Sequence, residues 1–187
     1  VVSQVLGDDP ADPKPEWLDT WHRIAPIEWE KWAAATYIKR LQARSDHLRY
    51  ALAYPIRETF RSNPKYYLVF ATRSFKAIPI MNDLICTEED DLFLRTEAVK
   101  KGQATFFGRL QDLEFDSQIE SLPEQVHEYG LAHPGCTRPD IIRHFLLERF
   151  GQFKVKHYRQ AIAKLVVVGR AEFASGQPND KNPINFT

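Results

Sequence analysis

Apolar positions recur at helical spacing in the first quarter of the chain. Between residues 27 and 43 they fall close to three or four positions apart, as on one face of an amphipathic helix. They are Trp29, Trp32, Ala33, Tyr37, Ile38 and Leu41. Pro26 precedes them and suits a first helical position, where its missing N–H leaves no hydrogen bond unmade. The pattern predicts a long helix over residues 27–43.

The period of the pattern changes to two from Leu48. Large apolar residues alternate with other residues over positions 48–54, as one face of a strand requires. Pro55 indicates either an edge strand or the end of this strand. The run over residues 66–72 is almost continuously apolar, which predicts a second strand buried on both faces. Because only a loop separates the two strands, we expect an antiparallel pair.

Patterns in the middle of the chain are weaker. Pro79 suits a first helical turn, so we expect a helix over residues 78–85. The acidic run over residues 88–91 lacks the ligand spacing and central glycine of a calcium loop, and we interpret it as a solvated helix start. Residues 100–102 indicate a helix end. We expect the segment from there to residue 116 to be irregular, with a short strand over residues 105–107.

The last third of the chain predicts three helices followed by a hairpin. Residues 119–130 place apolar side chains on one helical face and end in a glycine. Thr137 is the expected N-cap of a second helix, and a third is expected over residues 154–167. Two short strands, over residues 170–173 and 182–186, flank a turn that contains glycine and proline. Three helices and a hairpin in this order are typical of a winged helix.

Length and composition are those of a globular protein. The 187 residues suffice for one domain or two small ones, and 43% hydrophobic with 27% charged residues excludes disordered and collagen-like chains. We expect a linker over residues 1–25, an α/β region over 26–116 and a winged-helix domain over 117–187. No apolar run approaches the ~18 residues of a membrane helix, and the two cysteines lack metal-site spacing. We therefore expect a cytoplasmic protein without membrane contact.

Charge is balanced over the whole chain but not locally. Twenty-five basic and twenty-five acidic residues cancel, yet no acidic residue occurs between Arg149 and Ala171, a run that covers the third helix and the first hairpin strand. Such an element commonly binds nucleic acid, and a basic surface used for protein contacts is the alternative. The candidate nucleic-acid-binding residues are Lys154, Lys156, His157, Arg159, Gln160, Lys164, Arg170 and Lys181.

Signatures of catalysis and metal binding are sparse. The six histidines show no helical pair with the flanking glutamate of a zinc hydrolase, so no metal site is predicted. Cys136, at a helix start, is a candidate nucleophile, with an unreactive buried cysteine as the favoured alternative. Arg73 follows the second strand, where we favour a structural ion pair over a ligand contact. The sequence predicts no catalytic residue.

Two segments carry a resemblance to a known family. Residues 65–74, KYYLVFATRS, followed by Met81-Asn82-Asp83, resemble the late strand and next helix of the three-Cys-motif partner proteins, the TcmP family. Members of that family pair a class I methyltransferase-like region with a winged-helix-like tail. The resemblance implies that this chain, from about Trp17, corresponds to the back half of such a protein. It also implies that the two strands are the last pair of a Rossmann-like sheet.

The cofactor signature of such a sheet is missing. A glycine-rich turn after the first strand and an acidic residue after the second hold a nucleotide-like cofactor in Rossmann-like sheets. The chain has eight glycines and no such turn, so no residue is predicted to bind S-adenosylmethionine. Either that region was lost or cut away, or it lies upstream of Val1. We expect no cofactor in this chain.

Three functions remain open at this point. The first is a module that binds double-stranded nucleic acid and targets a methyltransferase-like protein. The second is the back half of an S-adenosylmethionine-dependent methyltransferase completed by an upstream region. The third is an adaptor that contacts a three-Cys-motif protein, for which we expect an exposed apolar patch around Phe106, Phe107 or Phe115.

Overall fold

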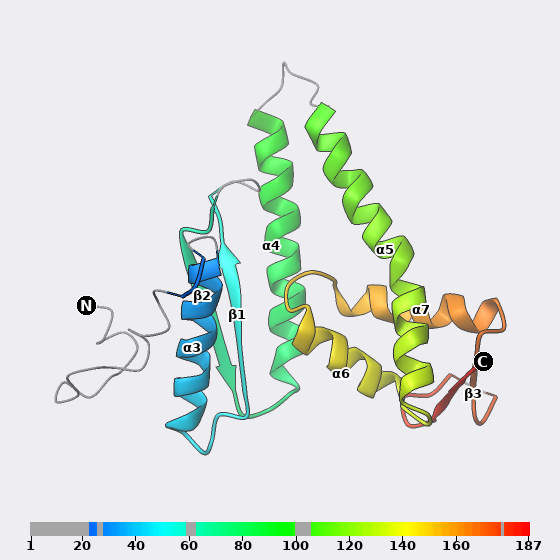
Figure 1. Ribbon diagram of the computed structural model, residues 1–187. Coiled ribbons are helices and arrows are strands. Elements are labelled where there is room, and N and C mark those ends of the chain that lie inside the picture. The colour runs from blue at the N-terminus through cyan, green and yellow to red at the C-terminus, as the bar shows by residue number, and fades with distance from the viewer. Residues whose placement is uncertain (1–22, 26–27, 59–62, 100–105, 177) are drawn as a thin grey trace. The chain divides into compact units, whose positions relative to one another are not determined.

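The computed structural model describes residues 23–25, 28–58, 63–99, 106–176 and 178–187 (Figure 1). The fold mixes helices with short antiparallel strands, as predicted. Contacts between residues divide the described chain into a first unit that ends at Phe75 and a second that begins at Lys76. Almost all of the linker expected over residues 1–25 lies outside the described residues.

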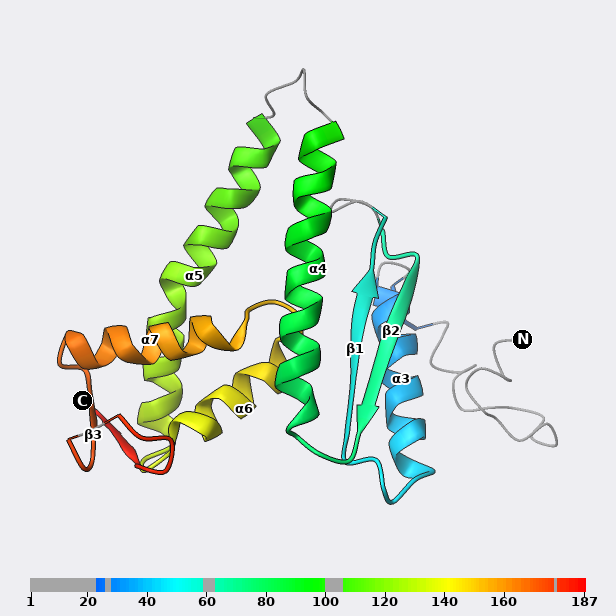
Figure 2. The same ribbon diagram turned by 180° about the vertical axis from the view of Figure 1, so that it is seen from behind.

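The first unit is a helix packed on a two-stranded sheet. It contains α3 (Trp29–Ala43), β1 (Tyr50–Ile56) and β2 (Tyr66–Thr72). The strands are antiparallel, as predicted, with Tyr50 opposite Thr72 and Ile56 opposite Tyr66. Figures 1 and 2 show α3 on one face of this sheet. Pro55 lies inside β1, which a two-stranded sheet tolerates because both of its strands are edges.

The prediction that β2 is buried on both faces is wrong. No residue of β2 is buried, and Tyr66 is 61% exposed. Of the seven residues of β1, only Ala51 and Tyr54 are buried. A continuous apolar run indicates that a strand is apolar on both faces. Whether those faces are buried depends on which elements cover them in the tertiary structure.

The second unit contains four helices and a hairpin among the described residues. The helices are α4 (Ala77–Val99), α5 (Phe106–Ala132), α6 (Arg138–Glu148) and α7 (Val155–Val167), followed by β3 (Ala171–Phe173) and β4 (Ile184–Phe186). β3 and β4 pair antiparallel, with Phe173 opposite Ile184. An isolated bridge joins Thr137 to Pro183, and the Ile184 N–H donates to the Cys136 carbonyl over 2.9 Å. The chain just before α6 therefore extends the hairpin sheet.

The core of the second unit lies between α5, α6, α7 and the hairpin. Its fully buried side chains are Leu122, Val126, Ile141, Leu146, Phe153, Tyr158, Ile162, Leu165 and Ile184. Each buried aliphatic side chain contributes about 1.5–3 kcal/mol relative to exposure in water, so these residues dominate the stability of the unit. Gly130 lies in α5 against Phe186, and a Cβ there would stand 2.3 Å from the Phe186 ring. The predicted helix end at Gly130 is therefore wrong, because this glycine permits close packing inside a helix that runs to Ala132.

α4 is much longer than the predicted helix over residues 78–85. Its buried side chains are Ile78, Asn82, Ile85 and Cys86, a helical pattern in which a polar residue occupies one core position. Because this asparagine is polar, the periodicity of the buried positions is interrupted in the sequence. The acidic run over residues 88–91 consequently lies inside α4, and its interpretation as a helix start is wrong.

α5 also begins earlier than expected. The irregular segment predicted before residue 116, with a short strand over residues 105–107, is instead helical from Phe106; residue 105 lies outside the described residues. Extending an existing helix costs little compared with starting one, so the packed C-terminal half of α5 supports the weakly patterned N-terminal half. Pro123 is accommodated inside the same helix.

The boundary between the two units differs from the one expected at residue 116. The contacts group α4 with the C-terminal helices. The Asn82 side chain accepts the Gly151 N–H over 2.8 Å and donates to the Phe153 carbonyl over 2.9 Å. Asp83 accepts the Val155 N–H over 2.9 Å. These bonds join α4 to the loop between α6 and α7, so that α4 is structurally part of the second unit.

Candidate nucleic-acid interface

One face of α7 is exposed and basic. Tyr158, Ala161, Ile162 and Leu165 anchor the opposite face in the core. The exposed side chains of α7 are Lys156, Arg159, Gln160, Ala163, Lys164 and Val167, which we call the α7 stripe. No acidic residue occurs in α7 itself. Within the described residues, Lys156, Arg159 and Lys164 form no ion pair, which leaves three positive charges on one helix face.

Lys154 is not part of this free surface. Its ammonium group donates to the Asp90 carboxylate of α4 over 2.8 Å, and its side chain is only 20% exposed. The hydrogen bond that Lys154 donates to Asp90 raises the pKa of Lys154 above its ordinary value. The neighbouring Asp83 accepts the first backbone N–H of α7. The first N–H of α7 and the ammonium group of Lys154 are therefore already paired with carboxylates of α4.

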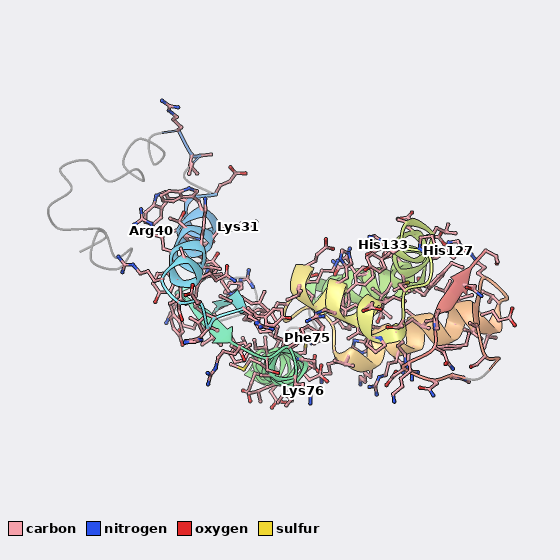
Figure 3. All side chains as sticks on the ribbon, turned by 90° about the horizontal axis from the view of Figure 1, so that it is seen from below. Lys31, Arg40, Phe75, Lys76, His127 and His133 are labelled. Carbon is pink, nitrogen blue, oxygen red and sulfur yellow. The ribbon has the colours of Figure 1, made fainter. Side chains whose placement is uncertain are left out.

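Arg170 is likewise engaged inside the unit. Its guanidinium donates to both oxygens of Glu124 over 2.6 and 2.8 Å, and also to Nδ1 of His127 over 2.8 Å. Since an arginine can only donate, Nδ1 of His127 must accept, and Nε2–H donates to the Thr187 carbonyl over 2.9 Å. His127, labelled in Figure 3, thus links α5 to the last residue of the chain. The Arg170 hydrogen bond lowers the pKa of Glu124.

His157 and Lys181 occupy different environments. His157 is half-buried, with its ring 6.1 Å from Phe115 and 6.3 Å from Phe153. Burial, aided by the charges of Lys156 and Lys154, lowers the pKa of His157 below 6.5, so the ring is neutral at pH 7. Lys181 is exposed in the turn of the hairpin. Of the eight predicted residues, the structure leaves Lys156, Arg159, Gln160, Lys164 and Lys181 exposed.

The hairpin turn is tied to the start of α6. Arg138 forms an ion pair with Asp180 in the turn, and its guanidinium lies 6.0 Å from the centre of the Phe173 ring. Figures 1 and 2 show the hairpin at the C-terminal end of α7. These contacts fix the turn that carries Lys181 to the first residue of α6.

Charge is segregated within the second unit. α5 contains six acidic residues and one arginine, whereas residues 138–187 contain nine lysines and arginines against four acidic residues. The part that contains α7 therefore has a net positive charge, and α5 has a net negative charge.

The other sequence-based candidates gain little from the structure. Cys136 is buried, which raises the pKa of its thiol, and burial raises the pKa of Cys86 to about 12. Neither thiol is an activated nucleophile.

Arg73 is exposed, and the ion pair favoured for it is not found among the described residues. Phe115 is 41% exposed, with its ring 5.8 Å from Phe153, whereas the side chains of Phe106 and Phe107 lie outside the description.

The remaining sequence-based candidates are the tryptophans and the metal-ligating side chains. Trp29 and Trp32 are half-buried on α3, while Trp17 and Trp21 lie outside the described residues. In the part of the chain that the structure covers, no three His, Cys, Asp or Glu side chains are arranged to hold a metal ion. Asn82, Asp83 and Asp90 were missed as contributors to the site. Asn82 gave no signal in the sequence, because its polar side chain interrupts the apolar pattern of α4.

No protein-family model, curated protein or solved structure matches the chain. No helix within the described ranges combines the length and the apolarity that crossing a membrane requires.

Proposed function

We propose that the second unit is a winged helix that binds double-stranded nucleic acid, with α7 as its recognition helix and the hairpin as its wing. The observation that carries the proposal is the α7 stripe, whose three cationic side chains form no ion pair among the described residues. When cationic side chains on an exposed helix neutralise phosphates, the counterions condensed on the nucleic acid are released. This release favours binding.

The arrangement around α7 supports this assignment. α5, α6, α7, β3 and β4 follow one another in the order of a winged helix, and the Thr137–Pro183 bridge supplies the short third strand that such a fold places before its second helix. α6 and α7 are joined by a short turn, as in helix-turn-helix modules, in which the second helix meets the nucleic acid.

We further propose that this unit targets a methyltransferase-like protein of the TcmP family to nucleic acid. The support is the resemblance of residues 65–74 and of Met81-Asn82-Asp83 to that family. Two residues of the second motif, Asn82 and Asp83, bond to the loop before α7 and to the start of α7. Methyl transfer from S-adenosylmethionine would require residues outside this chain.

Fluorescence anisotropy with a labelled 20-base-pair duplex tests the proposal. With about four phosphate contacts, we expect affinity to fall about 100-fold between ~50 and ~200 mM salt. The double charge reversal K156E/K164E should weaken binding relative to the wild-type chain and flatten this salt dependence. The matched control K31E/K39E changes the net charge equally on α3, where Lys31 and Lys39 are exposed, and should retain most of the affinity.

Either of two results would contradict the proposal. One is the absence of duplex binding by the wild-type chain at ~50 mM salt, which would favour an adaptor that uses the winged helix for protein contacts. The other is an equal loss of affinity in K156E/K164E and K31E/K39E, which would show that net charge alone is responsible.

A further inference from the structure

Building on the nucleic-acid binding proposed above, we propose that the ligand is B-form DNA, read in its major groove by the α7 stripe, and that α4 excludes phosphate from the N-terminus of α7. Three features of the second unit lead to this assignment: the occupied N-terminus of α7, the composition of the stripe, and the dimensions of the helix.

The N-terminus of α7 is closed to phosphate. Free helix N-termini attract phosphate through their unpaired N–H groups and the positive end of the helix dipole. Here the Asp83 carboxylate accepts the Val155 N–H over 2.9 Å, and the Asp90 carboxylate accepts from the Lys154 ammonium over 2.8 Å. These two carboxylates already engage the first N–H of α7 and the ammonium group beside it, and they repel a third anion. The contact surface therefore begins at Lys156.

The stripe beyond Lys156 mixes three kinds of side chain. Lys156, Arg159 and Lys164 supply charge for phosphates, and they surround Gln160, whose neutral amide both donates and accepts. A glutamine amide can pair with the two hydrogen-bonding groups of adenine in the major groove. Val167 continues the stripe as an apolar side chain that is 85% exposed. Apolar side chains in the major groove contact the methyl group of thymine.

The dimensions of α7 distinguish DNA from RNA. Lys156 and Lys164 are eight residues apart, about 12 Å along the helix axis, and a helix with its side chains is about 10–12 Å across. The major groove of B-form DNA, about 12 Å wide, admits such a helix. The major groove of A-form RNA is deep and narrow, and side chains cannot read it. On an RNA duplex, Val167 and Gln160 would reach no base edge in the major groove.

Competition between matched duplexes tests the choice of nucleic acid. The full chain is titrated with a 20-base-pair DNA duplex and with an RNA duplex of the same sequence at ~100 mM salt. We expect the DNA to bind at least about 10-fold more tightly, because only its groove admits the stripe. Equal affinity for the two duplexes would overturn the assignment to DNA. Absence of binding to both would overturn the proposed function as well, so the two failures are distinguishable.

Single neutralising substitutions test the exclusion of phosphate by α4. We expect K164Q to reduce the slope of log affinity against log salt by about 0.9, the value for one phosphate contact, and K154Q to leave the slope unchanged. D90N removes the partner of Lys154 and should steepen the slope, because the freed ammonium reaches a phosphate. An effect of K154Q as large as that of K164Q, or an unchanged slope in D90N, would overturn the exclusion. Circular dichroism of each variant verifies that the fold is retained.

Selection from a random pool of DNA duplexes tests base reading. The wild-type chain should enrich a sequence preference that Q160A and V167S weaken, without a change in salt slope. A preference that is identical in all three proteins would overturn base contact by these residues.

Discussion

Tyr158 illustrates how much of the second unit depends on single buried side chains. It is fully buried, with its ring 5.6 Å from Phe145 and 6.1 Å from Phe153. Its hydroxyl oxygen is buried without a hydrogen-bond partner among the described residues. Burial raises the pKa of Tyr158, so the phenol stays protonated at neutral pH. The ring stabilises the core, whereas the unpaired hydroxyl costs about 1–3 kcal/mol.

The substitution Tyr158→Phe should therefore maintain or raise the free energy of unfolding, by up to about 2 kcal/mol, since it removes only the unpaired hydroxyl. Tyr158→Ala, which also removes the ring, should cost about 3–5 kcal/mol. Urea denaturation of the full chain, followed by circular dichroism, measures both. If Tyr158→Phe lowers stability by more than about 1 kcal/mol, the hydroxyl has a partner that stabilises it.

Ion pairs within the second unit also determine which cationic side chains are available for binding. The sequence ranks Lys154, Lys156, Lys164 and Arg170 alike, because each lies in the same acid-free run. Their partners come from positions far away in the chain: Asp90 pairs with Lys154, and Glu124 pairs with Arg170. Only the tertiary structure separates the free charges from the paired ones.

At the scale of elements, the start of α6 is the clearest case of local specification. Thr137 is the N-cap, as predicted, and it forms a capping box in which the Asp140 carboxylate accepts the Thr137 N–H over 3.0 Å and the Thr137 hydroxyl over 2.6 Å. These hydrogen bonds lower the pKa of Asp140 below its ordinary value of 3.8.

Removing the cap should destabilise the second unit. Thr137→Ala should cost about 1 kcal/mol of unfolding free energy. A depressed folded-state pKa means that the ionised Asp140 stabilises the fold above the unfolded-state pKa and that this contribution is lost as pH falls through the folded-state pKa. The stability difference between wild type and Asp140→Asn should thus be complete at pH 6 and shrink below about pH 4.

Urea titrations at several pH values between 3 and 6 measure this dependence. Asp46→Asn, which removes one exposed carboxylate from the first unit, is the matched control. A stability difference for Asp140→Asn that stays constant over this range would show that the carboxylate contributes nothing to the cap through its charge.

Elements without a local signal were predicted poorly. α7 and β2 show strong patterns, a two-sided helix and a run of strand formers, and their predicted bounds agree with the structure to within one residue. α4 lacks such a pattern because Asn82 replaces an apolar residue at a core position. Its amide is satisfied by Gly151 and Phe153, some seventy positions away. A buried polar side chain can be predicted only if its partners are known.

At the scale of the whole molecule, α4 determines where the second unit begins. We expect a fragment of residues 76–187 to unfold cooperatively. A fragment of residues 117–187, which begins at the boundary expected from the sequence, lacks Asn82, Asp83 and the first eleven residues of α5. Removing Asn82 leaves the Gly151 N–H and the Phe153 carbonyl unpaired, at a cost of about 1–3 kcal/mol each.

The shorter fragment should therefore unfold at a clearly lower urea concentration than the longer one, or fail to fold. Circular dichroism of the two fragments against urea makes the comparison. Asn82→Ala in the longer fragment is the matched variant, since it removes the same two hydrogen bonds without shortening the chain. Equal midpoints for the two fragments would show that α4 is dispensable and that the unit begins near residue 117.

Features that depend on near neighbours can be predicted from the sequence alone. Helical and strand periodicity, the cap at Thr137 and the acid-free run from Arg149 to Ala171 involve residues a few positions apart, and the structure contains the corresponding elements. Each follows from local steric preference, from hydrogen bonding within one turn, or from composition.

Features that depend on distant residues follow only from the folded arrangement of the chain. This arrangement placed α4 with the C-terminal helices, left β2 without a buried residue, closed the N-terminus of α7 with Asp83 and Asp90, and freed Lys156, Arg159 and Lys164. Burial and charge pairing are interactions between side chains brought together by folding, so the spacing of residues along the chain predicts an apolar face but does not identify the residues that cover it or pair with it.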